Sequence, residues 1–392
     1  MKESENRSTL VLIMAVALLG MMGGSLMGPV LPAISGHFGV GGGRVGLVIT
    51  FYAASTAVSF PFMGYLTDRY GRKHVLIPAL IINGTAGILG ATAPNFSFLL
   101  FARVIQGIGI AGMAPMALIL IGDIYGGKER TAAMGKLSST RSGGGMIAPL
   151  LGGALASLHW SFPFFIYALS IPLAVVLWIW FPFPGKTSKI SVREYLKPLK
   201  EAGKDPRVQA VLLLNFLSFF LVYTVVTFIP QHLSREFGVS EALTGVFLAV
   251  QAVATITIAL QSGRLAELTH KTYLVGIGFL ISGFGFLLLP INGLLLWIAF
   301  SLLIFGLGRG FYQPQINTLV TEVAPAGRLG GVASVNNIAK YAGQMTAPIV
   351  LGVIMSYYGF STVFLISGSI GVATGIGTFL WISSKFMDED VS

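Results

Sequence analysis

Twelve apolar segments, each long enough to cross a lipid bilayer, follow one another along this chain of 392 residues. A membrane-spanning helix needs roughly 20 consecutive, mainly apolar residues. Because lipid offers the backbone no hydrogen-bond partners, segments of this length are expected to be helical. The sequence therefore predicts an all-α integral membrane protein with spans at 9–35, 44–66, 75–93, 96–122, 132–157, 161–182, 208–233, 241–263, 272–290, 294–320, 331–356 and 360–384.

The composition supports a lipid-facing protein. Only 10% of the residues are charged and 54% are apolar, whereas soluble domains carry about 25% charged residues. The sequence has no cysteine, which excludes disulfides, thiolate metal sites and cysteine nucleophiles. The net charge of +10 would suit a nucleic-acid partner, but the positions of the cations indicate another role.

Lysine and arginine mark one side of the predicted membrane protein. Loops rich in these residues stay in the cytoplasm. The opposite side carries only Arg44 and Arg235, whereas the connections after even-numbered spans carry many cations, among them Arg69, Arg72, Lys73, Lys128, Arg130 and Lys136. We therefore expect both termini on the cytoplasmic side of the plasma membrane, and no nucleic-acid partner.

The chain repeats itself at an offset of 199 residues. Acid matches acid in Asp123 with Glu322, and base matches base in Arg141 with Lys340. Proline matches proline in Pro149 with Pro348. We therefore predict two pseudo-symmetric six-helix bundles, an N-terminal half at 1–182 and a C-terminal half at 208–392. A cytoplasmic linker at 183–207 would join them, with a short surface helix from Ser191 to Gly203. Such repeats are typical of transporters whose site lies between the halves.

The connection after the second span carries a carboxylate in an unfavourable place. Asp68 lies at the C-terminal end of its helix, where the helix dipole disfavours negative charge. It needs a positive partner, which Arg69, Arg72, Arg130 or the start of a helix in the C-terminal half could supply. A partner in the other half would make a conformational latch, and the alternative is a weak surface ion pair.

The segment from Gly64 to Lys73 resembles the signature loop of the major facilitator superfamily. The resemblance implies the major facilitator fold and a latch at this loop, to which Asp123 would contribute from the end of the fourth span. The C-terminal half carries an eroded copy, Gly263 to Glu267, so a weaker latch is expected at Glu267.

The fourth span contains Arg103 about 12 Å inside the membrane, at 1.5 Å per residue. A guanidinium at that depth must face protein or a wet cavity, or else reach the outer interface. The segment from Phe101 to Gly109 resembles a second superfamily signature, whose arginine is linked to proton coupling. Because no carboxylate lies at mid-membrane depth, Asp123 acting with Arg103 is the candidate for proton coupling.

The fifth span is rich in small residues. Its segment from Gly143 to Gly153 resembles the signature of the drug:proton antiporter branch, with Ala148 in place of a glycine. Small residues let helices approach closely, so ordinary helix packing is the alternative explanation. The motif positions are Gly144, Ala148, Pro149, Gly152 and Gly153.

Four cations lie within predicted spans without an acid at the same depth. Among them, Arg141 and Lys340 are repeat equivalents near the midplane, and they would make an electropositive site for anionic, zwitterionic or neutral substrates. Alternatively, each pairs with a backbone carbonyl or packs away from the site. The predicted substrate-binding residues are Arg141, Arg309, Gln313, Asn336, Lys340, Tyr341 and Gln344.

These observations favour a secondary active transporter that exports small organic compounds, drug-like or anionic, by alternating access. The resemblance implies a proton gradient as the typical driving force. An importer or facilitator of an organic anion is the alternative. A membrane enzyme is disfavoured because no paired carboxylates or nucleophile motif lies in a span, and without a phosphate-binding loop ATP is not expected to drive transport. We expect a monomer in the bilayer, with no cofactor or metal.

The predicted topology can be tested with single cysteines, since the native chain has none. A cysteine at Ser188 should react only with reagents that reach the cytoplasm. A cysteine at Asn95 should react from outside the cell. The same sidedness at both positions would contradict the topology.

Overall fold

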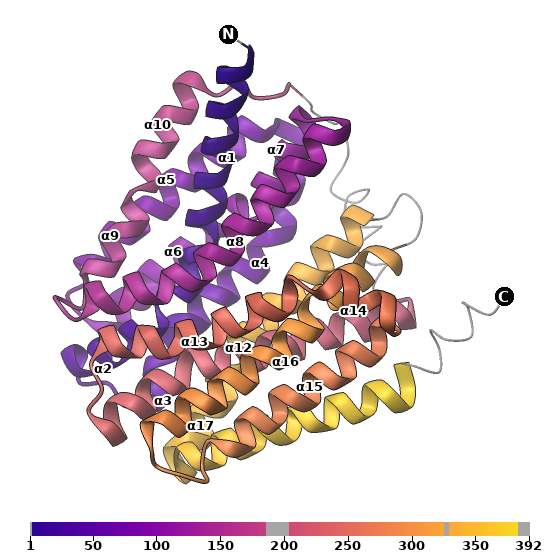
Figure 1. The fold of residues 1–392 in the computed structure, drawn as a ribbon. Helices are drawn as coiled ribbons and strands as arrows, with labels where there is room; N and C mark the ends of the chain where they lie inside the picture. The colour runs from indigo at the N-terminus through magenta and orange to yellow at the C-terminus, as the bar shows by residue number, and fades with distance from the viewer. Residues whose placement is uncertain (1, 186–203, 325–328, 383–392) are drawn as a thin grey trace.

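The structure is a computed structural model, and it describes residues 2–185, 204–324 and 329–382 (Figure 1). In these ranges every regular element is a helix. The N-terminal half contains α1 (Lys2–Ser25), η1 (Gly28–Val30), α2 (Leu31–Phe38), α3 (Gly42–Val45), α4 (Leu47–Tyr70), α5 (Arg72–Ala91), α6 (Phe96–Met113), α7 (Met116–Ile124), α8 (Gly127–Ala156), α9 (Phe162–Ala168) and α10 (Ser170–Trp180). The C-terminal half contains α12 (Pro206–Phe237), α13 (Glu241–Ala259), α14 (Ser262–Leu268), α15 (Lys271–Leu288), α16 (Leu295–Glu322), α17 (Leu329–Gly377) and η2 (Thr378–Ile382).

Several predicted spans are interrupted where the sequence supplies a reason. The first span, 9–35, divides into α1, η1 and α2, with Pro29 inside η1. The fourth, 96–122, divides at Pro115 between α6 and α7. Proline has no amide hydrogen to donate within a helix, so it favours such breaks. The sixth span, 161–182, also divides, at Leu169 between α9 and α10.

The structure accounts for twelve crossings. Among the described residues, 10 helices are long and apolar enough to span a membrane. The helix α8 is as long as a span but too polar for this criterion, since it carries several cations in its first half. The helix α17 turns back at Gly359, whose φ of 77° is readily accessible only to glycine, so it crosses twice. The predicted all-α fold is confirmed.

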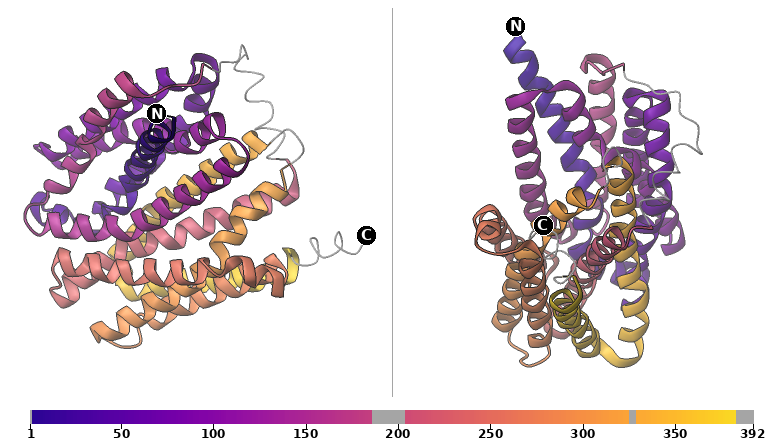
Figure 2. Two further views of the ribbon diagram at one scale, coloured as in Figure 1. Left: turned by 45° about the horizontal axis from the view of Figure 1, so that its top comes forward. Right: turned by 90° about the vertical axis from the view of Figure 1, so that its right-hand side faces the viewer.

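The two halves form separate helix bundles that meet along a limited interface (Figures 1 and 2). In the N-terminal half α4 and α5 pack on α6, and α1 packs on α8. In the C-terminal half α12 packs on α17, and α15 packs on α16. Between the halves, α8 lies against α13, and α4 lies against α17. The predicted boundaries at 182 and 208 stay a prediction, because most of the linker, including its expected surface helix, lies outside the described residues.

The sequence repeat is also a repeat of contacts. The Thr56 hydroxyl donates to the Gly107 carbonyl at 3.1 Å, and the Thr255 hydroxyl donates to the Gly306 carbonyl at 3.0 Å. Both residues of the second pair lie 199 positions after those of the first. The same polar clamp therefore joins α4 to α6 and α13 to α16.

The contacts between the halves are related by the same repeat. A Cβ at Gly46 would lie 2.8 Å from the Cβ of Pro348 on α17. A Cβ at Gly245 would lie 2.6 Å from the carbonyl oxygen of Pro149 on α8. Only glycine permits these approaches. We call the end of the bundle where α10 ends and α12 begins the linker end. The opposite end is the one where α3 and α13 begin and α12 ends, and the contacts at Gly46 and Gly245 lie toward it.

Gly153→Val should separate α8 from α13, because a Cβ at residue 153 would collide with the backbone oxygen of Glu241. Gly143→Val is the matched control, since a Cβ at that position of the same helix meets no atom within 4 Å. Overpacking costs about 1–3 kcal/mol, which changes the ratio of two states roughly 5- to 150-fold. The readout is alkylation of a single thiol placed by Thr244→Cys, a buried position on α13.

Alkylation of this thiol should become roughly tenfold faster with Gly153→Val, in line with that range, and should not change with Gly143→Val. Equal rates in both variants would show that the contact does not hold the opposite end closed.

Candidate functional site

Two carboxylates share one arginine at the linker end of the N-terminal half. The Arg72 Nε atom lies 2.8 Å from Oδ2 of Asp123, and its Nη1 atom lies 3.8 Å from Oδ1 of Asp68. Gly71, with φ of 88°, ends α4 and lets α5 begin at once, which places Arg72 close to the end of α4. Arg72 also donates to the Thr67 carbonyl. The positive charge at this helix C-terminus offsets the unfavourable dipole beside Asp68.

The other predicted latch residues surround this triad. Arg69 is exposed and donates to the phenol oxygen of Tyr65. Arg130 is exposed beside Gly122, where a Cβ would lie 3.2 Å from its Nη2 atom. Glu267 is an exposed residue of α14. The structure thus pairs Asp68 with Arg72 of its own half, and a partner in the other half stays a prediction.

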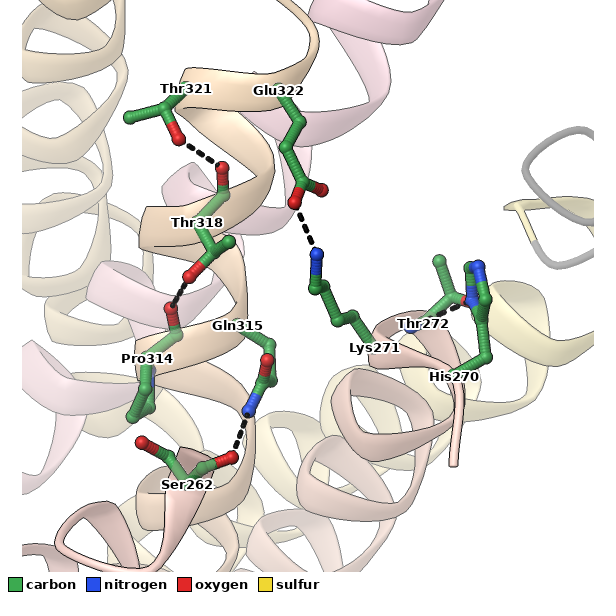
Figure 3. Close-up of polar contacts among 9 residues, drawn as sticks. All are labelled: Ser262, His270, Lys271, Thr272, Pro314, Gln315, Thr318, Thr321 and Glu322. Atoms are coloured by element: carbon green, nitrogen blue, oxygen red, sulfur yellow. Dashed lines mark hydrogen bonds and ion pairs between the residues drawn. The ribbon is translucent and has the colours of Figure 1, made fainter. Parts of the chain in front are cut away.

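A second ion pair occupies the corresponding place in the C-terminal half (Figure 3). Lys271, which begins α15, pairs with Glu322, which ends α16. These residues are the repeat equivalents of Arg72 and Asp123. The sequence analysis assigned the second latch to Glu267 and missed this pair. The signal was available, because the offset of 199 carries one pair onto the other.

Arg103 faces the protein interior and is 1% exposed. It donates to the Gly23 carbonyl of α1 at 2.9 Å and to the Val48 carbonyl of α4 at 3.1 Å. It also bonds to the Gln106 side chain, and its guanidinium carbon lies 4.6 Å from the centre of the Tyr52 ring. Arg103 therefore ties three helices together, and the alternative that it reaches the outer interface is wrong. Its role in proton coupling stays a prediction.

The small residues of the helix-5 motif lie where α8 meets α1 and α13. Gly144 faces Leu18 of α1, and a Cβ at Gly152 would collide with the backbone oxygen of Leu26. Gly153 faces the start of α13 in the same way. The two remaining motif residues, Ala148 and Pro149, are buried. The motif therefore builds a close contact both within the N-terminal half and between the halves.

Arg141 and Lys340 come from the two halves, on α8 and α17. Arg141 donates to the Ala114 carbonyl at 3.3 Å, which satisfies part of its guanidinium. The Lys340 Nζ atom lies 4.8 Å from the centre of the Phe219 ring and 5.4 Å from that of Tyr341. Ring faces carry partial negative charge and attract a cation. Neither contact supplies a negatively charged partner.

Arg309 adds a third cation from α16. Its Nε atom is buried and has no hydrogen-bond partner. Both Arg141 and Arg309 lie within electrostatic range of Lys340. The titratable side chains that influence the two arginines are tyrosines. In the described part of the chain, no ion pair includes Arg141, Arg309 or Lys340.

The predicted polar residues Gln313, Asn336 and Gln344 all lie on the C-terminal half, on the helices α16 and α17 that carry Arg309 and Lys340. Gln313 accepts a hydrogen bond from Ser218 at 2.8 Å, and Asn336 accepts one from Asn215 at 2.7 Å. Both bonds join α12 to its neighbours, as polar residues commonly do between membrane helices. Gln344 is 3% exposed and leaves its Oε1 atom without a partner. Its role in binding stays a prediction.

Aromatic rings connect the two halves beside the cations. The Tyr341 ring of α17 lies 6.5 Å from that of Tyr52 and 6.0 Å from that of Phe60, both on α4. Sequence reasoning singled out Tyr341 but missed Tyr52 and Phe60. Aromatic residues are frequent in apolar spans, so no sequence signal distinguished them. Among the described residues, no group of three or more His, Cys, Asp or Glu side chains could hold a metal ion.

Comparisons with known proteins identify the family of this chain. A family model for the Major Facilitator Superfamily matches residues 13–344 and 211–389. The chain is similar to the Bacillibactin exporter of Bacillus subtilis (strain 168), at 26% identity over 97% of this chain and 98% of that protein. It is also similar to a multi-drug resistance efflux pump of Streptococcus pneumoniae serotype 4, at 28% identity over 87% of each chain.

Solved structures share the fold at lower identity. A bacterial homolog to the human lysosomal transporter Spinster, in an inward-facing and unoccupied conformation, aligns with a TM-score of 0.78 at 20% identity, over 96% of this chain and 95% of that one. The human organic anion transporter MFSD10 aligns with a TM-score of 0.71 at 18% identity, over 95% and 99% of the two chains.

Asp68→Asn should reduce transport at least tenfold while leaving expression and thermal stability unchanged. The partly exposed carboxylate holds Arg72 only at long range, so losing it costs little stability, about 0–1 kcal/mol for such pairs. Transport should nevertheless fall, because the asparagine carries no negative charge with which the latch could re-form in each transport cycle. Wild-type uptake rates in vesicles would contradict the latch.

Exchange of both charges of the Lys271–Glu322 pair should impair transport less than a change of either charge alone. Each single change, Lys271→Glu or Glu322→Lys, places like charges side by side, and the double change restores the attraction. Transport should fall in both single variants and recover in the double variant. Glu267→Gln removes an exposed acid nearby and serves as the control. No recovery in the double variant would mean that the pair has no role in the cycle.

Proposed function

We propose that this chain, which belongs to the Major Facilitator Superfamily, exports small organic compounds from the cell by alternating access. The names of its relatives, an exporter and a multi-drug efflux pump, support the outward direction. The proposed substrate site lies between the halves, where Arg141 and Lys340 approach from α8 and α17. Pockets for organic ligands are mostly apolar with a few placed polar groups, and this neighbourhood fits that description.

One observation carries the proposal: the halves meet through repeat-related contacts of small residues. Gly46 packs on Pro348 and Gly245 packs on Pro149, so each half offers the other the same type of surface. Close-packed contacts of this kind, accompanied by only a long hydrogen bond at 3.4 Å from the Thr50 hydroxyl to the Met345 carbonyl, can separate and re-form at little cost. The ion pairs at the linker end, in contrast, lie within each half. Each half can therefore move as a unit while the interface opens and closes.

The proposed orientation in the membrane indicates to which side the substrate site is closed in this structure. If the linker end faces the cytoplasm, as the cations predict, the contacts at Gly43 and Gly352 lie toward the outer surface. The site would then be closed to the outside, which is the state in which an exporter collects its substrate from the cytoplasm.

Proton coupling forms the finer part of this proposal, and the geometry constrains it. Asp123 is held by Arg72 at the linker end, and Arg103 is held by backbone carbonyls of α1 and α4. Arg103 lies on α6 and Asp123 near the end of α7, so coupling through both residues would have to pass along these two helices. A substrate that carries its own proton is the remaining route.

Vesicles containing the purified protein test export and its coupling together. With an inward-directed proton gradient, organic compounds should leave faster than from protein-free vesicles. If protons pass through Asp123 and Arg103, the variants Asp123→Asn and Arg103→Gln should abolish the response to the gradient. A response that survives in both variants would exclude this route. Accumulation that the gradient drives only inward would replace export with import.

A further inference from the structure

We infer that Arg141, Arg309 and Lys340 bind the negatively charged group of an aromatic organic anion, and that export of this anion moves net negative charge, driven by the membrane potential. The inference rests on the proposed export function and adds both the substrate class and the driving force. It starts from these three cations, which are partly exposed and come from α8, α16 and α17.

The first step is the imbalance of charge at the centre. Lys340 has two cations within electrostatic range and contacts the rings of Phe219 and Tyr341. Arg141 uses one nitrogen on a backbone carbonyl, and the Nε atom of Arg309 is buried without a partner. Buried charges are normally paired because removing them from water is costly. None of the three takes part in an ion pair among the described residues. Cations that stay without an acid inside the protein therefore indicate a site that is completed by an anion.

The contrast with Arg103 shows that burial alone does not leave a cation incomplete. Arg103 is more deeply buried than the three site cations, yet it bonds to two backbone carbonyls and to Gln106. It is satisfied as a structural residue. The protein therefore has the means to neutralise a buried guanidinium from within, and it does not do so at Arg309.

The second step concerns the rest of the ligand. The rings of Phe219 and Tyr341 lie beside Lys340, and the Tyr341 ring in turn contacts Tyr52 and Phe60 of the other half. Aromatic rings pack against one another in offset or edge-to-face arrangements. An anion that carries an aromatic ring would thus find its charge and its apolar body matched by adjacent groups.

The third step concerns protons. A proton antiporter must release a proton when its substrate binds. An anion that arrives beside Lys340 stabilises the charged ammonium form, so it retains the proton instead of displacing it. The acids of this chain lie near the ends of the spans, in the linker or at the termini. Exchange of an anion for a proton at this site therefore has the wrong sign.

The membrane potential supplies a driving force without any such exchange. In a transport cycle the protein returns to its starting state, so the net charge moved equals the charge of the substrate. When an anion leaves a cell whose interior is negative, its electrostatic free energy falls in proportion to the membrane potential. For one charge and 100 mV, this energy supports a concentration ratio of about 50-fold.

Two probes with the same ring and opposite charge test the inference. Naphthalene-2-sulfonate is permanently anionic, and 2-naphthyltrimethylammonium is permanently cationic. Vesicles containing the full-length protein are loaded with either probe, and a potassium gradient with valinomycin sets the potential at equal pH. We expect efflux of the sulfonate to accelerate when the interior is made negative and to ignore a pH gradient when the potential is held at zero.

Variants locate the site. Lys340→Gln and Arg309→Gln should slow sulfonate efflux roughly tenfold or more, in line with the loss of a hydrogen bond to a charged group. Arg141→Gln should have a similar effect. Lys136→Gln is the matched control, since it removes an exposed cation from the same helix as Arg141. Elution from a size-exclusion column checks that each variant is folded.

The outcomes separate the inference from the function on which it rests. Sulfonate efflux that follows the pH gradient instead of the potential overturns the proposed driving force. Transport of the ammonium probe instead of the sulfonate overturns the substrate class, and export remains. Equal slowing by Lys136→Gln overturns the site. If the protein moves neither probe while it still exports other organic compounds from vesicles, the inferred substrate class is overturned and the proposed export stands; if it exports no organic compound at all, the proposed export is also contradicted.

Discussion

The cost of placing charge inside a membrane governs the centre of this protein. Each buried cation there has to find compensation from its surroundings, because lipid supplies none. Arg103 finds it in backbone carbonyls and in doing so fastens α6 to α1 and α4. Lys340 has only ring faces, and Arg309 keeps a buried nitrogen unpaired. The same physical demand thus separates a residue that holds the N-terminal half together from residues that we propose to bind a ligand.

The repeat of 199 residues explains how the protein can move. It places the Thr56–Gly107 clamp and its copy Thr255–Gly306 inside the two halves, where each stabilises its own bundle. It also places glycine against proline at the interface, as in Gly46 with Pro348. The two clamps therefore act within the halves, whereas the halves meet mainly through close packing, together with a long hydrogen bond from the Thr50 hydroxyl to the Met345 carbonyl at 3.4 Å. Such a division suits two rigid bodies that rock about their contact surface.

Much of this was predictable from the sequence, and the exceptions have physical reasons. Apolar length gave the spans, and the motifs gave the resemblance to the superfamily, which the comparisons confirm. The breaks near Pro29 and Pro115 follow from prolines that the sequence shows, although the predicted spans did not include them. The place of Arg103 required the fold, because a sequence does not tell which neighbour satisfies a buried group. The Lys271–Glu322 pair was predictable from the repeat. The ring contacts of Tyr341 with α4 were not, since they depend on how the halves meet.

Distances between spin labels would test the rigid-body account most directly. One pair, at Glu129 and Leu268, spans the linker ends of the two halves, and another, at Glu129 and Trp180, lies within the N-terminal half; all three residues are exposed. When substrate is added, the account predicts that the first distance shortens while the second stays constant. A change in the second distance with the first unchanged would contradict it.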